Sequence, residues 1–197
     1  MNPLKRYVVW LSRMSHSRGF GVQSPSAYRF IRYVLCEHYP YYAYGELRRT
    51  HPSLPWLTRK RMELYFRLAN FRQADTWIDN GDDTTLLNEY VAKGCRKTRV
   101  ANGCSKADIA NGCANSTVQI ARVCMTDGCE EYLGQLLANT DQNSVIVIED
   151  IASNPVARRM WQQLVRNKAV SVSYDLYYLG VAFFDTERFK TNYIVNF

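Results

Sequence analysis

The sequence predicts an α/β fold: a mostly parallel sheet with helices on both faces, an antiparallel hairpin at one edge and an N-terminal helical extension. The first observation is Ser144 to Asp150, in which four consecutive β-branched apolar residues show no polar alternation. A strand of this kind is covered on both faces and is typical of the centre of a parallel sheet. The second observation is that helical patterns lie directly before and after it, as in one step of a doubly wound sheet.

Capping signals mark the helices on either side of this strand. Asp127 and Glu130 have the spacing of a capping box, which predicts that Asp127 begins a helix. Asn154, followed by a proline, predicts the start of the next helix. Ligands in open α/β sheets bind beyond the carboxyl ends of the strands, so Glu149 and Asp150 are candidate site residues.

The extension is expected to contain two helices and a tyrosine-rich connector. The spacing of Leu4, Val8 and Leu11 predicts a first helix over about residues 3–14. Ser24, followed by a proline, predicts the start of a second helix that ends near residue 40. The connector, residues 39–56, interleaves tyrosines with arginines, so its rings either pack on the domain or stack against nucleic-acid bases.

The remaining elements follow in order. Thr58 is expected to cap a helix to residue 71, which leads into a short strand at residues 76–79. Asp82 or Asp83 is expected to cap the next helix, and residues 98–101 and 118–125 are expected to be strands. Residues 170–174 and 180–184 lie too close in sequence for a parallel crossover, so they are expected to form the antiparallel pair before a last strand at 193–195.

Charge is distributed unevenly along the 197 residues. Residues 1–75 carry 13 Lys and Arg against 4 Asp and Glu, whereas the whole chain has a net charge of +7. This basic N-terminal part indicates either a nucleic-acid or anionic partner, or an ordinary solvated face. The sequence contains no apolar run near the ~20 residues of a membrane span and no secretory signal pattern at its start, so a cytoplasmic protein is expected.

The six cysteines are scattered through an α/β pattern, so free thiols are expected. Cys95, Cys104 and Cys113 recur at a spacing of nine residues, and Asn-Gly-Cys occurs twice. Zinc sites favour close pairs such as Cys-x-x-Cys, which this chain does not contain. Two glycine-containing turns are the favoured interpretation, and no metal site is predicted.

The order of elements resembles that of class I S-adenosylmethionine-dependent methyltransferases, specifically a Bacteroidetes group with an N-terminal helical extension. The residues that carry the resemblance are Gly21 to Pro25 with Tyr28, the helix over 64–71, the strand over 144–151 and the closing strands. Gln23 departs from the histidine typical of that group. The resemblance implies a Rossmann-like domain over residues 58–197, an extension over 1–57, and S-adenosylmethionine as the cofactor.

By the same resemblance, the cofactor contacts are Asp79, Gly81 and Asn102. Asp79 and Gly81 match the acidic residue and first glycine that follow the first strand, where the backbone must approach the cofactor closely. The later glycine of the motif is absent, and Asp82 and Asp83 stand in the turn, where like charges oppose the carboxylate of the cofactor. Asn102 replaces the acidic residue that accepts the ribose hydroxyls. The domain is also short around residues 102–116, where a strand and a helix are expected to be missing.

Asp127 and Asp150 are the catalytic candidates that the resemblance implies after the fourth and fifth strands. Methyl transfer needs in-line positioning and, for an oxygen or nitrogen acceptor, a base, for which Asp150 is the candidate. Two carboxylates on adjacent strand ends suit a divalent cation, but a helix cap is the favoured interpretation of Asp127.

The sequence leaves two functions open. The first is a methyltransferase that acts on an unknown acceptor. The second is a non-catalytic scaffold of methyltransferase descent that binds RNA or a protein partner through its basic N-terminal part.

Overall fold

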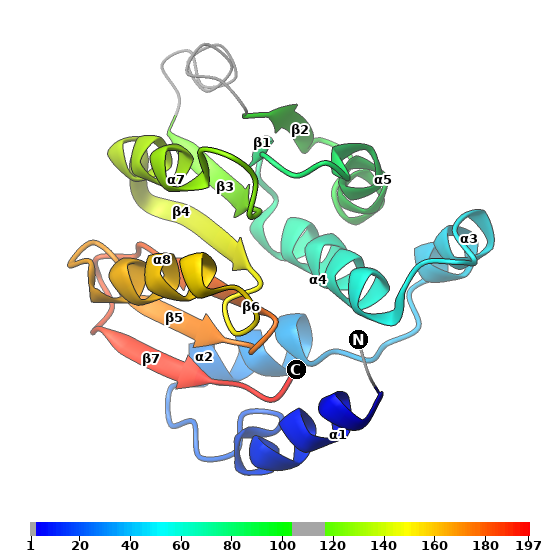
Figure 1. Cartoon of the computed structure of the whole chain (residues 1–197), viewed down its shortest axis with the longest axis horizontal. Helices are drawn as coiled ribbons and strands as arrows, with labels where there is room; N and C mark the ends of the chain where they lie inside the picture. Colours follow the sequence, from blue (N-terminus) through cyan, green and yellow to red (C-terminus); the bar gives the residue numbers. More distant parts are fainter. Residues whose placement is uncertain (1–2, 104–116) are drawn as a thin grey trace.

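In the computed structural model, which describes residues 3–103 and 117–197, the strands form one seven-stranded sheet in the order β2-β1-β3-β4-β6-β5-β7 (Figure 1). Neighbouring strands are parallel from β2 to β4 and between β5 and β7, while β6 runs antiparallel to both β4 and β5. The strands are β1 (Thr76–Asp79), β2 (Arg99–Asn102), β3 (Val118–Val123), β4 (Thr140–Glu149), β5 (Val172–Asp175), β6 (Leu179–Phe183) and β7 (Thr191–Ile194).

Strand β4 lies at the centre of this sheet, as its unalternating sequence predicts. Val145, Ile146, Val147 and Ile148 each have an exposed fraction of 0%. Val145 and Val147 pack on one face, whereas Ile146 and Ile148 pack on the other. The prediction of a doubly covered central strand is therefore confirmed, and β4 runs parallel to β3 and antiparallel to β6.

Helices cover both faces of the sheet (Figure 1). One hydrophobic cluster joins the sheet to the helices that come before β1 or directly after it, and the other joins it to the helices on either side of β4. The first set consists of α2 (Pro25–Phe30), the π-helix η2 (Ile31–Leu35), α3 (Tyr42–Thr50), α4 (Trp56–Arg72) and α5 (Thr84–Gly94). The second consists of α7 (Cys129–Ala138) and α8 (Pro155–Arg166).

Two of the predicted helix caps are present and two are wrong. The Asn154 side chain accepts hydrogen bonds from two backbone N–H groups of α8, and the Ser24 side chain accepts one in α2. Asp127 does not cap α7, because the N-cap is Gly128, with φ of +76° and no side-chain cap bond. Thr58 does not cap α4, which begins earlier, at Trp56. The observed N-cap lies one residue after Asp127 in α7 and three residues before Thr58 in α4, at Pro55, so neither side chain has the position that a cap requires.

The antiparallel pair formed by β5 and β6 is confirmed. Strand β6 inserts between β4 and β5, so β7 lies beyond the hairpin and forms the outermost strand. The loop between β5 and β6 is only three residues long, and Tyr178 lies at its end, next to the carboxyl end of β4. This loop therefore enters the region where the parallel strands end.

The connector of the extension packs closely on the rest of the protein, whereas its first helix does not. Tyr41 and Tyr44 lie with their ring centroids 5.1 Å from that of Phe66, so these connector rings pack on the domain. By contrast, Leu4 and Val8 of α1 (Pro3–Ser12) are 69% and 58% exposed. A short 3-10 helix, η1 (Met14–His16), follows α1.

The described residues include four of the six cysteines, Cys36, Cys95, Cys124 and Cys129, and all four are free thiols. Cys104, Cys113 and the predicted shortening around residues 102–116 lie outside the described residues. No helix in the described part of the chain is long and apolar enough to cross a membrane.

Candidate functional site

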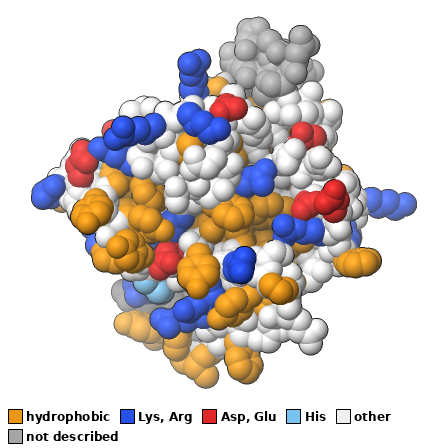
Figure 2. Space-filling view, turned by 180° about the vertical axis from the view of Figure 1, so that it is seen from behind, with side chains coloured by type: hydrophobic (Ala, Val, Ile, Leu, Met, Phe, Trp, Pro, Cys, Tyr) orange, Lys and Arg blue, Asp and Glu red, His pale blue; other side chains and the backbone are white. Residues whose placement is uncertain are grey.

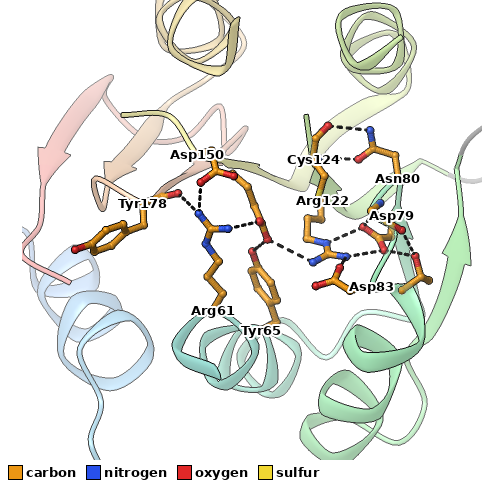
Figure 3. Close-up of polar contacts among 12 residues, drawn as sticks. Arg61, Tyr65, Asp79, Asn80, Asp83, Arg122, Cys124, Asp150 and Tyr178 are labelled. Atoms are coloured by element: carbon orange, nitrogen blue, oxygen red, sulfur yellow. Dashed lines mark hydrogen bonds and ion pairs between the residues drawn. The ribbon is translucent and has the colours of Figure 1, made fainter. Parts of the chain in front are cut away.

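The carboxyl ends of β1, β2, β3 and β4 meet along one edge of the sheet, where the sequence predicts the site. The strand register places Asp79 beside Asn102 on one side and beside Arg122 on the other. Figure 3 shows the side chains of Asp79 and Arg122 directed toward each other, with Arg122 next to Tyr65 of α4.

Asp79 is completely engaged by the protein itself. Its carboxylate accepts hydrogen bonds from Arg122 Nε and Nη2, at 2.7 and 2.9 Å. It also accepts from the Gly81 backbone N–H at 3.1 Å and from Thr84 Oγ1 at 2.6 Å. Its exposed fraction is 0%. A carboxylate with four donors has no remaining need for a ligand.

Arg122 links three carboxylates. Besides Asp79, its guanidinium lies 2.5 Å from an oxygen of Asp83 and 3.4 Å from an oxygen of Glu149. Burial alone would lower the pKa of Arg122, but the hydrogen bonds that its guanidinium donates to Asp79 and the charge of Glu149 raise it above its ordinary value. Asp83 stands at the N-cap position of α5, as predicted, but its side chain binds Arg122 and does not cap the helix.

Helix α4 contributes two further side chains to the cluster, Arg61 and Tyr65. Arg61 donates to Glu149 and to Asp150, both at 2.6 Å. Tyr65, one helical turn further, donates to the other oxygen of Glu149. Burial raises the pKa of the Tyr65 hydroxyl well above its usual value, and the Glu149 charge raises it further, so Tyr65 acts as a hydrogen-bond donor.

Asp150 has an unusual backbone for a non-glycine residue. Its φ is +57°, in the left-handed region, and its N–H donates to the carbonyl oxygen of Tyr178 at 2.8 Å. Arg61 donates to the same carbonyl at 2.9 Å. The turn after β4 is therefore fixed by Tyr178 and Arg61 together, which compensates for the backbone strain at Asp150.

We name this cluster the strand-end network. Its members are Arg61, Tyr65, Asp79, Asp83, Arg122, Glu149 and Asp150 (Figure 3).

The network fills the space beside the turn that follows β1. A Cβ atom built on Gly81 would lie 2.5 Å from Arg122 Nη2 and 3.0 Å from Cys124 Sγ. The glycine is therefore required here because the Arg122 side chain comes so close to the backbone. The close approach that the sequence assigned to a cofactor is made by an internal guanidinium.

The structure brings some of the predicted site residues together and leaves others apart. Asp79, Gly81 and Asp150 all lie in or against the strand-end network. Asn102 stands beside Asp79 in register, with an exposed side chain. Asp127 is exposed at the start of α7 and is not part of the network. In the described part of the chain, no group of three or more His, Cys, Asp or Glu side chains is arranged to hold a metal ion.

Sequence reasoning missed Arg61, Tyr65 and Arg122. A signal for Arg122 was present, because it is the single charged residue of a strand that otherwise reads as buried. Charged side chains are almost never fully buried unless they are paired, so Arg122 implied an acidic partner without identifying it. The spacing of four between Arg61 and Tyr65 places both on one face of a helix.

Comparison with known proteins supports the fold. No protein-family model and no curated protein matches the sequence. The solved structure of cofactor-bound Rv0187 from MTB is similar, with a TM-score of 0.51 and 12% identity over 94% of this chain and 99% of that chain. This likeness extends over nearly all of both chains, and it agrees with the Rossmann-like α/β architecture that the sequence predicts.

Two further solved structures cover about three quarters of the chain. One is the O-methyltransferase TomG from Streptomyces achromogenes, involved in tomaymycin synthesis and in complex with SAM, with a TM-score of 0.49 and 15% identity over 74% of this chain and 91% of that one. The other is a methyltransferase from Geobacter sulfurreducens, with a TM-score of 0.49 and 12% identity over 73% and 88%.

Proposed function

We propose that this protein is a methyltransferase-like scaffold whose cofactor site is closed, so that it does not transfer methyl groups. Support for methyltransferase descent comes from the reversed strand β6 beside β4 and from Asp79 and Gly81 at the end of β1. The observation that carries the loss of activity is the position of Arg122, whose guanidinium occupies the space beside Gly81 and saturates Asp79.

Opening this site is energetically expensive. A cofactor that contacts Asp79 must displace Arg122 from a pair in which the side chains are 1% and 0% exposed. Breaking a buried pair by removing one partner costs about 3–5 kcal/mol, which lowers affinity by roughly two to four powers of ten. The carboxylates of Asp79, Asp83 and Glu149 would then face the carboxylate of the cofactor without their guanidinium.

The candidate base is also engaged. A general base must be within reach of the proton that it removes. Asp150 accepts a hydrogen bond from Arg61 at 2.6 Å, and the same oxygen lies 3.2 Å from the hydroxyl of Ser153. Proton removal by this oxygen would have to compete with these donors.

Calorimetry of the full chain with S-adenosylmethionine at millimolar concentration tests the proposal, and no binding heat is expected. Measurable heat from the unmodified protein would overturn it. The double variant Asp82→Gly with Asp83→Gly separates the two explanations of the closed site. If carboxylate repulsion closes the site, this variant gains affinity. The position of Arg122 predicts that it does not, because the guanidinium stays bound to Asp79.

A scaffold needs a partner, and the basic N-terminal part is the surface that we propose for it. Apart from Arg61, its cations lie outside the strand-end network, and Arg6, Arg59 and Lys60 take part in no ion pair in the part of the chain that the structure describes. Methyl transfer plays no role in this function.

A further inference from the structure

A cavity of about 680 Å³ lies between α1, the first turns of α4, the ring of Tyr178 and the C-terminal Phe197. Cavities of about 300–1,000 Å³ are typical of small-molecule sites. Figure 2 shows hydrophobic side chains together with Lys and Arg side chains at the lower edge of the molecule, where Figure 1 places α1. We name this cavity the basic pocket. Its lining includes Arg6, Trp10, Trp56, Arg59, Lys60 and Phe197.

The basic pocket contains cations without acidic partners. Among the ion pairs of the described residues, Arg48 binds Glu63 at 2.8 Å, but Arg6, Arg59 and Lys60 take part in none. Arg59 donates only to backbone carbonyls, through Nη2, and its Nε is buried without a hydrogen-bond partner. The positive charge of this cavity is therefore available to an external anion.

Lys60 is partly buried in this pocket. Its pKa is lowered to about 8, chiefly by burial and also by the charges of Arg6 and Arg67, while Cys36 and Glu63 oppose this effect. An ammonium held in such surroundings gains more from a bound anion than an exposed lysine does, because the anion restores the charge stabilisation that burial removed.

Aromatic rings form the walls beside these cations. The Arg6 guanidinium lies 4.2 Å from the ring centroid of Trp56. Lys60 Nζ lies 5.0 Å from that of Trp56 and 4.4 Å from that of Phe197. Trp10, on α1, is 48% exposed and also lines the cavity. Cations next to exposed aromatic faces are the combination that binds a planar base and its phosphate.

We propose that the basic pocket binds a nucleotide, with the phosphate at Lys60 and Arg6, which both contact the ring of Trp56, and the base against the exposed indole ring of Trp10. Phosphate oxygens accept charge-assisted hydrogen bonds from both cations, and stacking on an indole ring suits any base. An acidic peptide would satisfy the cations but would leave the exposed indole face of Trp10 unused. The nucleotide comes either from the free pool or from single-stranded RNA, and the chemistry at the pocket is the same.

This inference rests on the proposed scaffold function, since it names the partner class, but its test contains no S-adenosylmethionine. A failure of one test therefore leaves the result of the other unchanged. The site also lies apart from the strand-end network: the ring of Tyr178 faces the basic pocket, while its backbone carbonyl accepts from Arg61.

Calorimetry of the full chain tests the inference with four probes. These are adenosine 5′-monophosphate, a short 5′-phosphorylated oligoadenylate, inorganic phosphate and polyglutamate. Binding is expected for the oligoadenylate, for the mononucleotide or for both, and stronger than for inorganic phosphate. Binding of the mononucleotide identifies the free pool as a sufficient source. Binding of the oligoadenylate alone identifies RNA, and its affinity should then fall steeply with salt.

Substitutions locate the site. Lys60→Gln, Arg6→Gln and Trp56→Leu should each weaken binding by about five- to a hundredfold. Arg6 is exposed on α1, so Arg6→Gln keeps the test valid if a variant at the half-buried Lys60 unfolds. Lys168→Gln, an exposed lysine after α8, is the matched control and should bind like the unmodified protein. Absence of binding to both nucleotide probes, equal binding of polyglutamate, or equal loss in the Lys168 control would overturn the proposal.

Discussion

Lys60 and Arg61 are consecutive in sequence, yet they belong to two regions that treat positive charge in opposite ways. Arg61 points into the strand-end network, where it contacts two carboxylates at 2.6 Å. Lys60 points into the basic pocket, where its neighbours are the rings of Trp56 and Phe197. A cation that the protein pairs with its own carboxylates holds the fold together, whereas one left beside aromatic rings is available to a ligand.

The two environments also move the pKa values in opposite directions. Burial by itself lowers the pKa of Arg61, but Glu149, Tyr65 and Asp150 together outweigh it and the pKa rises above its ordinary value. Burial lowers the pKa of Lys60 to about 8 with no ion pair to offset it in the described chain. The choice of residue fits these roles, because a planar guanidinium can contact two carboxylates at once whereas an ammonium is a point charge. The comparison predicts that substitutions in the two regions change the free energy of unfolding in opposite directions.

The largest effect is expected from Arg122→Ala. Removing this guanidinium leaves Asp79, which is 0% exposed, and Glu149 without their shared cation, so the free energy of unfolding should fall by about 3–5 kcal/mol. Urea denaturation measures the loss. Arg159→Ala is the matched control, because Arg159 is 62% exposed and 3.8 Å from Glu130, and it should cost about 0–1 kcal/mol. Equal losses would mean that the network stabilises no more than a surface pair.

A smaller loss is expected from Tyr65→Phe. The ring packing against Trp77 is kept, but the buried Glu149 loses a hydrogen-bond donor. Hydrogen bonds to charged groups contribute about 1.5–3 kcal/mol, so the free energy of unfolding should fall by that amount in the same urea experiment. Tyr42→Phe removes the hydroxyl from a side chain that is 99% exposed and should have no measurable effect. A neutral result at Tyr65 would mean that its hydroxyl contributes nothing to the stability of the network.

Lys60→Met, by contrast, is expected to raise the free energy of unfolding. The pKa of Lys60 lies near 8 in the folded protein and at 10.5 in the unfolded chain, so the charged form is disfavoured by folding. The free energy of unfolding should therefore rise by about 1–3 kcal/mol at pH 7.

The gain in the free energy of unfolding from Lys60→Met should depend on pH. Between pH 8 and pH 10.5 the unfolded wild-type chain binds more protons than the folded one, so the wild-type protein gains stability with rising pH and the variant does not. The advantage of Lys60→Met should shrink through this window and vanish above it. Urea denaturation of both proteins at pH 7 and at pH 10 measures the difference, with Lys168→Met as the control. A destabilised or pH-independent variant would contradict the assignment of Lys60 to an unpaired site.

Local sequence patterns determined much of the fold. The run Val145 to Ile148 predicted a doubly covered central strand, because apolar residues on both faces of a strand must be buried on both faces. Asn154 predicted the start of α8, since capping depends only on residues within one helical turn. The spacing between residues 174 and 180 predicted the β5–β6 pair, because no crossover fits there. Each of these inferences uses residues that are neighbours in the chain.

The sequence also predicted that Asp79, Gly81 and Asp150 lie at the same edge of the sheet, but it did not determine what occupies that edge. The predicted obstacle was carboxylate charge at Asp82 and Asp83, whereas Asp83 is paired with Arg122. Arg122 and Asp79 are 43 residues apart, and Arg61 and Glu149 are 88 apart. No local pattern connects such positions, because side chains this distant in the chain meet only when the strands take their register and α4 docks on the sheet. Only tertiary structure therefore decided that Arg61 is paired and that its neighbour Lys60 is not.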